Sequence, residues 1–460
     1  MAKRSFILAG LGYGDEGKGR MCDFLVHRFC CDKVVRYGGG PQAAHNVVSP
    51  EGISHRFSQF GSGTLVPGVK TYLTNRMIFD PLQLMLEDGV LADQGITDAL
   101  ERTYIDEDCF IVTPLHRLIN QIRETARGND RHGSCGQGVG EASSDVKQYG
   151  PSMMLQVKDI FDSEAMWRKL KKIQKTKKIA ANRVIESIGY APLHLENLKK
   201  ELEDFDLHQL MEQYRNIGDL INVRHHRTIL REIAEGDAVF EGAHGLLLGE
   251  EYGFFPHVCR FDTSFNNALE LLDDADYDGE VIRLAITRGY LTRHGAGPLV
   301  THDPEMEQYI PPCHNHNHNL VWQGQIRLGW FDLLTARYAL SILGRVDGLA
   351  VTNLDRMTNC PKIKVATVYQ HDEAAVASPL VCSYGLVQEL KQVKSAQVWS
   401  APHALNRCRP GYKSEPEWHI TDPDGYQPDS PYLKFLAERL KTPVIATAFG
   451  PTAKDTICLL

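Results

Sequence analysis

The stretch LGYGDEGKGR, residues 11–20, has glycines and a lysine at the spacing of a phosphate-binding loop. Gly12, Gly17 and Lys18 fall at the pattern G-x-x-x-x-G-K, and an apolar run precedes them. A glycine-rich turn between a strand and a helix exposes backbone N–H groups, and the helix N-terminus adds positive potential. A lysine at this position can reach the outer phosphates. The loop therefore predicts binding of a nucleoside triphosphate.

The same loop departs from an ordinary phosphate cradle in two ways. Gly19 stands where a Ser or Thr would hold magnesium, and the acids Asp15 and Glu16 lie inside the loop. The alternative is a tight turn with no ligand, but buried uncompensated carboxylates are costly, which disfavours it. Magnesium would resolve the conflict, because Asp15 could supply the oxygen ligand that the absent hydroxyl cannot.

The sequence GDEGKGR resembles the GDEGKGK signature of the adenylosuccinate synthetase family. The resemblance runs from about residue 5 to 458. It continues in chain order through VVRYGGGPQAAHNVV (34–48), GSCGQGVG (133–140), FEGAHGLLL (240–248), TRHGAGPL (292–299), IRLGWFD (326–332), TNLD (352–355) and FGPT (449–452).

This resemblance implies a carbon–nitrogen ligase driven by a nucleoside triphosphate. In the family, the 6-oxo group of inosine monophosphate takes a phosphoryl group from GTP, and the amine of aspartate then displaces the phosphate. The resemblance also implies Mg²⁺ as cofactor and a homodimer with an arginine donated across the interface. Since the matching arginine position falls near Gln148–Tyr149, the dimer is less secure here.

The resemblance assigns catalytic roles to three side chains. Asp15 would be the base and a magnesium ligand, His45 the general acid on the phosphoryl oxygens, and Lys18 a charge on the phosphates. A histidine titrating near neutrality suits acid catalysis, and its position after the GGG turn favours this role over the alternative, a polar turn residue. The backbone carbonyl of Ala44 matches a second magnesium ligand at a position that is normally Gly.

A second group of residues is predicted to bind the nucleoside triphosphate. Asn353 replaces a lysine that reads guanine, whereas Asp355 could accept hydrogen bonds from guanine N1 and N2, so GTP is the first expectation and ATP the alternative. The predicted residues are Gly14, Glu16, Gly17, Lys18, Gly19, Asn353, Asp355, Gly450 and Pro451.

Positions that would contact the other substrates have changed more than the catalytic ones. Cys135, beside Ser134, and Cys259 stand where threonines hold the 5′-phosphate, and thiols are poor donors. Only Arg327 remains of the arginines that grip the aspartate carboxylates. The predicted substrate-binding residues are Gln42, Ser134, Cys135, His244, Cys259, His294 and Arg327.

Several apolar runs that end in turns must position these loops. The pattern predicts strands at 5–11, 33–37, 237–242, 347–355 and 442–451, and helices at 19–29, 114–126, 194–216 and 330–344. This alternation predicts an α/β fold with a large, mainly parallel central sheet flanked by helices, similar to P-loop NTPases. Ligands of such sheets bind beyond the carboxyl ends of the strands, where all the unusual loops lie.

Composition limits the class of protein. The 460 residues carry a formal net charge of −8 and 43% hydrophobic residues, which argues against nucleic acid as a partner. No stretch has the length of a membrane span or a signal peptide, and the 11 cysteines have no framework spacing. We expect a single catalytic domain, residues 1–460, in the cytoplasm, with a peripheral elaboration around 371–400.

Three polar segments remain. The tract CHNHNHN (313–319) could bind zinc or contact an acidic substrate, but a polar loop is favoured. The basic run 169–180 is predicted to be a surface segment, with a phosphate-steering patch as the alternative. The charged segment 199–215 is predicted to be a helix with a solvated face.

Two alternatives to the ordinary reaction stay open. One is a paralogue that keeps the phosphoryl chemistry but takes another purine nucleotide or nucleoside, such as dGMP, or another amino acid. The other is a non-catalytic regulatory protein that binds nucleotide. The joint presence of Asp15, Lys18 and His45 argues against the second.

Overall fold

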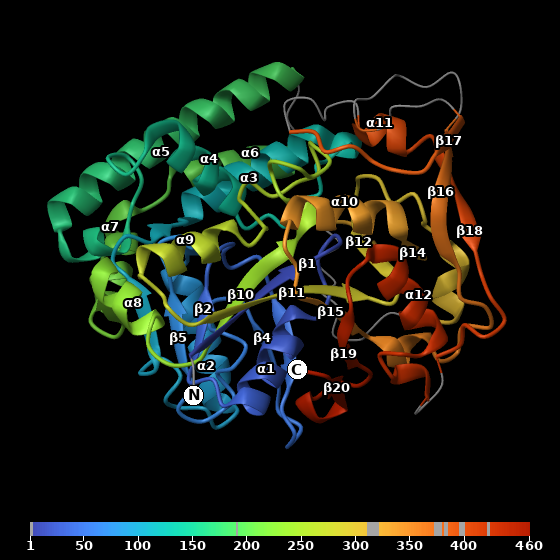
Figure 1. Ribbon diagram of the computed structural model, residues 1–460. Coiled ribbons are helices and arrows are strands. Elements are labelled where there is room, and N and C mark those ends of the chain that lie inside the picture. The colour runs from blue at the N-terminus through green and yellow to red at the C-terminus, as the bar shows by residue number, and fades with distance from the viewer. Residues whose placement is uncertain are drawn as a thin grey trace.

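A twisted, mostly parallel sheet forms the centre of the protein (Figure 1). The computed structural model describes residues 3–189, 192–310, 322–371, 380, 385–394, 401–420 and 424–460. In spatial order the ten strands of this sheet are β20 (Thr456–Cys458), β19 (Val444–Ala448), β15 (Gly348–Thr352), β11 (Glu280–Arg288), β1 (Arg4–Gly10), β10 (Ala238–Gly245), β2 (Lys33–Arg36), β5 (Lys70–Leu73), β7 (Thr103–Asp106) and β9 (Asn222–Arg224). Only β20 runs antiparallel to its neighbour.

Helices cover the sheet, and α3 to α7 gather at one end of the molecule (Figure 1). The helices are α1 (Lys18–Phe29), α2 (Pro81–Asp93), α3 (Pro114–Arg127), α4 (Val139–Tyr149), α5 (Ser163–Ile188), α6 (Leu193–Glu203), α7 (Leu207–Gly218), α8 (His226–Ile233), α9 (Asn266–Asp274), α10 (Leu333–Leu343), α11 (Ala401–Leu405) and α12 (Pro431–Leu440). The predicted α/β class and parallel sheet are confirmed.

Besides the central sheet, the described residues form four smaller sheets. Two strand pairs, β3 (His45–Val48) with β4 (Ser54–Phe57) and β12 (Leu291–His294) with β13 (Ile326–Gly329), carry site residues. The others are β6 (Ile78–Phe79) with β8 (Phe110–Ile111), and β14 (Phe331–Asp332) with β16 (Val365–His371), β17 (Gly385–Val387) and β18 (Cys408–Lys413).

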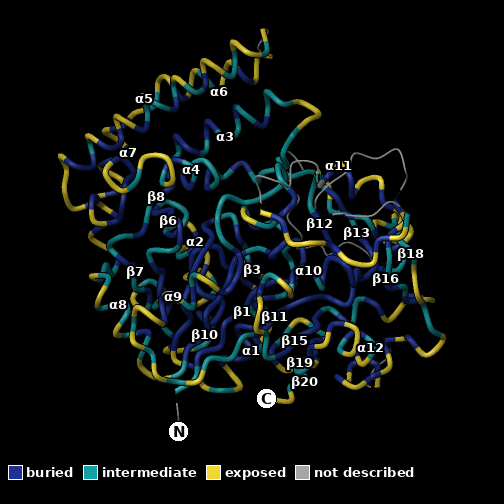
Figure 2. The backbone as a smooth tube through the Cα atoms, turned by 45° about the horizontal axis from the view of Figure 1, so that its top comes forward, coloured by how far each residue is buried: buried dark blue, intermediate teal, exposed yellow. Residues whose placement is uncertain are grey.

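The central strands are buried on both faces, as Figure 2 shows in dark blue. In β1, Ile7 and Ala9 point into one apolar core, whereas Phe6 and Leu8 point into another. This period of two is a property of strands, and burial of both faces explains why β1 reads as a continuous apolar run. The end of β1 is thereby held rigidly, which fixes where the following loop begins.

Two predicted helices differ in the structure. The segment 194–216 forms α6 and α7, because Asp206 interrupts it and caps α7 by accepting from the N–H groups of His208 (2.8 Å) and Gln209 (3.1 Å). The helix predicted at 330–344 begins only at Leu333, capped by Asp332. Strands β5, β7 and β11 and the long helix α5 were not predicted.

The basic run 169–180 lies within α5, and two of its lysines are not at the surface. Lys169 donates to Asp159 at 2.7 Å, and Lys177 lies 2.6 Å from Asp145, with both lysines buried. The prediction of a surface segment is therefore wrong at these two positions. None of the described helices combines the length and apolar character needed to cross a bilayer. The histidine tract, 313–319, and most of 371–400 lie outside the described residues.

Close packing of α1 against β3 explains the glycine at position 19. A Cβ atom on Gly19 would lie 2.5 Å from the Cβ of His45 and 2.8 Å from the Oγ of Ser62. A serine or threonine here would push α1 away from His45. The missing hydroxyl is thus the consequence of bringing the loop and His45 together.

We predict that Gly19→Ala lowers the free energy of unfolding by about 1–3 kcal/mol through overpacking. The matched control is Gly89→Ala on the exposed face of α2, where a Cβ meets nothing within 4 Å. That control should gain up to about 1 kcal/mol, because alanine is the better helix former. Urea denaturation measures both, and a shift of the two variants in the same direction would contradict the packing argument.

A second prediction concerns Asp23, which is buried on α1. Neither of its carboxylate oxygens accepts a hydrogen bond within the described residues, and burial raises its pKa to about 7 against the opposing effect of Arg20. Because the folded state disfavours the ionised form, the free energy of unfolding should fall as pH rises from about 4 to 7. Asp23→Asn removes this loss and should stabilise the protein by about 1–3 kcal/mol at pH 8, but little at pH 4.

Thermal or chemical denaturation of Asp23→Asn at both pH values provides the measurement. Asp93→Asn at the exposed end of α2 is the control, and as a surface substitution it should change the free energy of unfolding by no more than about 0.5 kcal/mol. An equal effect of Asp23→Asn at pH 4 and pH 8 would rule out the ionisation argument.

Candidate active site

The loop between β1 and α1 is closed from inside by Glu16. Its carboxylate accepts from the N–H groups of Gly12 (3.0 Å) and Gly14 (2.7 Å), and Lys18 donates to it at 2.6 Å. Glu16 and Lys18 are 3% and 2% exposed. The cost of a buried carboxylate is therefore offset within the loop itself, by two amides and one ammonium group. Glu16 faces the loop's own amides and gives the turn its shape.

Asp15 points the other way, toward a cavity. Its backbone adopts a left-handed conformation (φ 57°), and its carboxylate Oδ2 lies 2.8 Å from Nε2 of His294. Arg288 donates from Nε to the backbone carbonyl of Asp15. Left-handed conformations are unfavourable for residues other than glycine, so these contacts hold Asp15 in place. The two acids of the loop thus separate, with one inside and one presented.

His45, at the start of β3, is paired with a buried glutamate on β10. Its Nδ1 atom lies 2.5 Å from Oε1 of Glu241, which is fully buried. Glu241 also accepts from the N–H (3.0 Å) and the hydroxyl of Ser62. Nδ1–H donation to an ionised carboxylate would fix the tautomer of His45 and leave Nε2 available to a ligand.

Charges around this pair settle its ionisation. Burial opposes ionisation of Glu241, but His45, with Arg36 and Ser62 adding, lowers the pKa of Glu241 to about 2. Burial lowers the pKa of the His45 imidazole, against the opposing effect of Glu241. The pair is therefore an ionised carboxylate that orients an imidazole.

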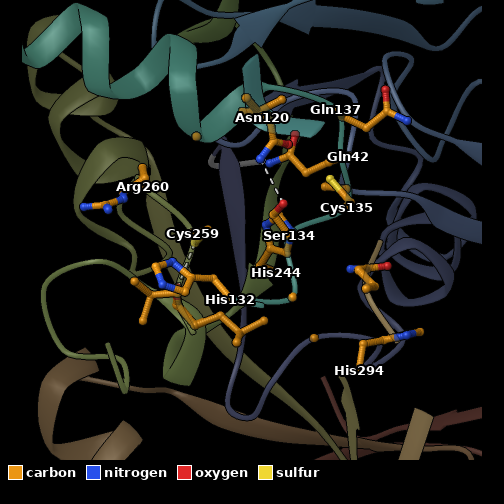
Figure 3. Close-up of a pocket in the computed structure, with 18 of the residues that line it drawn as sticks. Gln42, Asn120, His132, Ser134, Cys135, Gln137, His244, Cys259, Arg260 and His294 are labelled. Atoms are coloured by element: carbon orange, nitrogen blue, oxygen red, sulfur yellow. Dashed lines mark hydrogen bonds between the residues drawn. The ribbon is translucent and has the colours of Figure 1, made fainter. Parts of the chain in front are cut away.

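Most of the predicted site residues line a single cavity of about 440 Å³. Asp15, Lys18 and His45 line it together with others from distant segments, and Figure 3 shows Gln42, Ser134, Cys135 and His244 around it. The predicted site residues that line the cavity are Gly14, Asp15, Lys18, Gln42, Ala44, His45, Ser134, Cys135, His244, Cys259 and His294.

The side chains that replace hydroxyls and amides in this cavity are electrically neutral. Burial raises the pKa of Cys135 to about 11 and that of Cys259 to about 12, so both stay thiols. Burial, with Lys18 adding, lowers the pKa of His244 to about 3. The Cys259 thiol already donates to the carbonyl of Leu248 at 2.9 Å.

The residues predicted to read the triphosphate's base lie on another side of the loop. Asn353 and Asp355 follow β15, and Gly450 and Pro451 follow β19, the next strand of the sheet. Thr352 connects this edge to the loop, since its hydroxyl donates to the carbonyl of Glu16 at 2.6 Å. None of these four residues lines the cavity. The loop therefore separates two regions.

Arg327 lies beside the cavity on β13, where its Nη2 donates to the carbonyl of Gly297 at 2.7 Å. Arg293 on β12 is buried next to it and lies over the ring of Tyr13, with 4.3 Å between the guanidinium carbon and the ring centroid. Burial lowers the pKa of Arg293 to about 10, against the opposing effect of Tyr13, and the nearby Arg327 lowers it further. Two adjacent guanidinium groups favour an anionic ligand.

Sequence reasoning missed Glu241 and Arg56. Glu241 stands within the apolar run that forms β10, and a charge inside a fully buried strand was the signal that could have found it. Arg56 on β4 lines the cavity, and its pKa is lowered by burial and raised by Asp15. No equivalent sequence signal marks Arg56.

A family model described as adenylosuccinate synthetase matches residues 7–457. The chain belongs to the adenylosuccinate synthetase family. It is accordingly a carbon–nitrogen ligase, as the resemblance of its loops implies. The adenylosuccinate synthetase of Acidithiobacillus ferrooxidans is 30% identical and covers 99% of this chain and 98% of its own. The adenylosuccinate synthetase of Halothermothrix orenii is 28% identical, and the match covers 98% of this chain and 97% of that protein.

Solved structures show the same fold. The fully ligated adenylosuccinate synthetase from Plasmodium falciparum superposes with a TM-score of 0.73 at 19% identity, over 98% of this chain and 99% of that one. The succinoaminodeoxyadenylate synthetase of cyanophage S-2L, bound to dGMP and dATP, superposes with a TM-score of 0.55 at 15% identity. The match covers 100% of this chain and 96% of that one. At these identities the likeness concerns the fold alone.

We predict that Glu241→Gln lowers kcat by about 10²-fold or more, since positioned acid–base groups contribute 10²–10⁴. The KM for the triphosphate should change little, because Glu241 acts through His45. Steady-state kinetics, with circular dichroism as the check on folding, measure this. The control Glu201→Gln alters an exposed carboxylate on α6 and should leave kcat unchanged. Equal kcat for Glu241→Gln and wild type would contradict the role.

Proposed function

We propose that this protein uses GTP to phosphorylate the 6-oxo group of a purine, and that an amino acid amine then displaces the phosphate. Inosine monophosphate and aspartate are the base case. The observation that carries the proposal is that Asp15 and His45 line one cavity, with His45 paired from behind with Glu241 and with Lys18 at the first turn of α1. A base and an oriented imidazole on one cavity are what proton removal and phosphoryl transfer require.

In this proposal Asp15 removes the proton from purine N1. Its Oδ2 lies 2.8 Å from Nε2 of His294, so the carboxylate is held on the side of the cavity. With its Nδ1–H donated to Glu241, His45 can act as an acid only after it takes a proton on Nε2, which the anionic phosphates would favour; the Nε2–H then donates to the transferring phosphoryl group. The loop amides that Glu16 does not hold, and Lys18 once it leaves Glu16, would contact the phosphates, and Arg56 adds a further positive charge to the cavity.

The donor atoms present fit a magnesium ion. The carboxylate of Asp15 and the carbonyl of Ala44 are hard oxygen ligands on one cavity. Within the described residues, no group of three or more His, Cys, Asp or Glu side chains could hold a metal ion, so phosphate oxygens and water would complete the coordination. Bound there, Mg²⁺ would neutralise charge on the transferring phosphoryl group.

The remaining partners are proposed on narrower grounds. Asp355 supports GTP over ATP, because a carboxylate can accept hydrogen bonds from guanine N1 and N2. Burial raises the pKa of Asp355, and the charge of Arg20 opposes that rise. Arg327 and Arg293 support a carboxylate-bearing amine donor such as aspartate. Family membership is the support for proposing a homodimer and a cytoplasmic location.

A paralogue with altered substrates is the second candidate. The neutral side chains of Cys135, Cys259 and His244 in the cavity favour it. Another purine nucleotide, such as dGMP, or a nucleoside would then be the acceptor. The non-catalytic alternative is disfavoured, because Asp15, Lys18 and His45 lie together on one cavity.

Asp15→Asn tests the proposal through product mass and phosphate release. With GTP, Mg²⁺, a panel of purines and a panel of amino acids, wild type should form one condensed product and release phosphate. Asp15→Asn should lose at least about 10²-fold in kcat, because asparagine cannot accept the N1 proton. Asp219→Asn, an exposed control, should match wild type.

Two results would count against parts of this account. Equal activity of Asp15→Asn and wild type would remove Asp15 as the base, and nucleotide binding without turnover in both would favour the non-catalytic alternative. Turnover of inosine monophosphate and aspartate at the rate usual for this family would instead restore the base case over the paralogue.

A further inference from the structure

Arg293 on β12 is a buried cation that lines the cavity. Its side chain is 1% exposed, and no carboxylate in the described part of the chain forms an ion pair with it. Burial, with Arg327 adding, opposes its charged form, and Tyr13 favours it. A buried charge is unfavourable unless other groups solvate it. The atoms that take the place of a counter-ion therefore indicate what this arginine does.

Groups from three segments of the chain solvate the guanidinium group of Arg293. Its Nη1 donates to the carbonyl of Pro298 at 2.7 Å, and its Nη2 donates to the carbonyl of His257 at 3.2 Å. Its flat face lies over the ring of Tyr13, with 4.3 Å between the guanidinium carbon and the ring centroid. Burial raises the pKa of Tyr13 to about 12, against the opposing charge of Arg293, so the ring is a neutral phenol that attracts a cation to its face.

Each of these three segments contributes to the cavity lining. Residues 13–15 belong to the β1–α1 loop, residues 256–261 to the chain between β10 and α9, and residues 293, 294 and 296 to the end of β12 and the loop that follows it. His294, whose Nε2 lies 2.8 Å from Oδ2 of Asp15, comes directly after Arg293. One guanidinium group thus connects the segments that carry the predicted base and its histidine neighbour.

His257 extends this connection to the loop between α3 and α4. Its Nδ1 lies 3.0 Å from the carbonyl oxygen of His132. Because a carbonyl oxygen can only accept, Nδ1 of His257 carries the proton and donates it. His132 also lines the cavity, and Figure 3 shows His132, Cys259 and His294 around it. Four separate segments of the lining are therefore connected through Arg293 and His257.

The loop after β12 packs directly on the guanidinium group. Gly297 has a left-handed φ of 103°, and a Cβ atom there would lie 2.2 Å from Nη2 of Arg293. The carbonyl of Gly297 accepts from Nη2 of Arg327 at 2.7 Å, and Arg327 stands opposite Arg293 across β12 and β13. Like charges directly opposite each other destabilise a strand pair. Stability alone therefore gives little reason for an arginine at position 293.

We infer that Arg293 is a positioning residue, which holds the β1–α1 loop, residues 256–261 and residues 294–298 in one arrangement around the cavity. A planar guanidinium group can donate to two carbonyls in fixed directions and stack on an aromatic ring at the same time. A lysine keeps the charge but offers one ammonium group without this shape, so it should not replace Arg293. The inference rests on the proposed function in one respect, since it takes the cavity as the acceptor site.

Hydrogen exchange of the full chain without ligand tests the coupling of these segments. In Arg293→Met and in Arg293→Lys, amides within 257–261 and 294–297 should exchange about tenfold or more faster than in wild type, because the contacts that hold these segments are lost. Amides of α5 should keep their wild-type rates. Arg337→Met is the matched control, because Arg337 on α10 donates to the carbonyl of Arg439 at 3.0 Å and does not line the cavity. Wild-type exchange rates in both Arg293 variants would overturn the inference.

Steady-state kinetics test whether this coupling serves the reaction. In both variants the KM for the purine acceptor should rise about tenfold or more, because small displacements of positioned groups are costly. The KM for GTP should stay within about twofold, since the residues predicted to bind it lie at the ends of β15 and β19. Recovery of the wild-type acceptor KM by Arg293→Lys would overturn the inference, because charge alone would then suffice. Circular dichroism checks folding, and Arg293→Lys decides the test if Arg293→Met does not fold.

Turnover by the wild type separates this inference from the proposed function. A wild type that forms no condensed product with any purine removes the proposed function, and the exchange rates of the two variants then decide the inference. Turnover by the wild type, with faster exchange but an unchanged acceptor KM in both variants, supports the proposed function and overturns the inference.

Discussion

The carboxylate of Glu16, held by two amides of its own loop and by Lys18, is the interaction on which the site depends. A negative charge buried in a phosphate cradle would be unfavourable alone. Paired inside the turn, it closes the loop and leaves Asp15 in a left-handed conformation, aimed at the cavity. One loop thereby borders two regions: the residues predicted to bind the triphosphate lie at the ends of β15 and β19, and the cavity lies on the side of Asp15.

The sheet supports this arrangement by bringing buried charges to its central strands. Glu241 on β10 lies under His45, and Arg36 on the neighbouring β2 helps to keep it ionised. The closeness of α1 to β3, which only a glycine at position 19 permits, places His45 beside the start of α1. Packing and electrostatics therefore act together, since the contact that excludes a hydroxyl also brings the imidazole to the loop.

Much of the fold could be predicted from local patterns. The strands β1, β2, β10, β15 and β19 are short apolar runs followed by turns, and their buried faces make that pattern strong. Strand β11 was not predicted, because the charged residues Glu280, Arg283 and Arg288 interrupt its apolar residues. The break between α6 and α7 depends on how Asp206 caps the second helix, a local hydrogen bond that periodicity does not reveal.

The sequence predicted which residues line the cavity better than it predicted how their charges are paired. The sequence motifs at 11–20 and 34–48 mark Asp15, Lys18 and His45, and all three line one cavity. These motifs do not show that Glu16 turns inward, or that Glu124 and Glu141 form ion pairs with arginines of α3, because these contacts depend on the paths of α3 and α4 in space. Ion-pair partners separated by 18 residues, as Arg123 and Glu141 are, follow from tertiary structure and not from spacing.

The central claim is that the loop delivers a phosphoryl group to an acceptor held on the Asp15 side. Positional isotope exchange in GTP labelled with ¹⁸O at the β,γ-bridge, measured with Mg²⁺ and acceptor but without amine donor, tests it most directly. The label should scramble into the non-bridging positions of the β-phosphate only when the acceptor is present, since reversible transfer frees the β-phosphate to rotate. Scrambling that does not depend on the acceptor, or none in an enzyme that forms the condensed product, would contradict it.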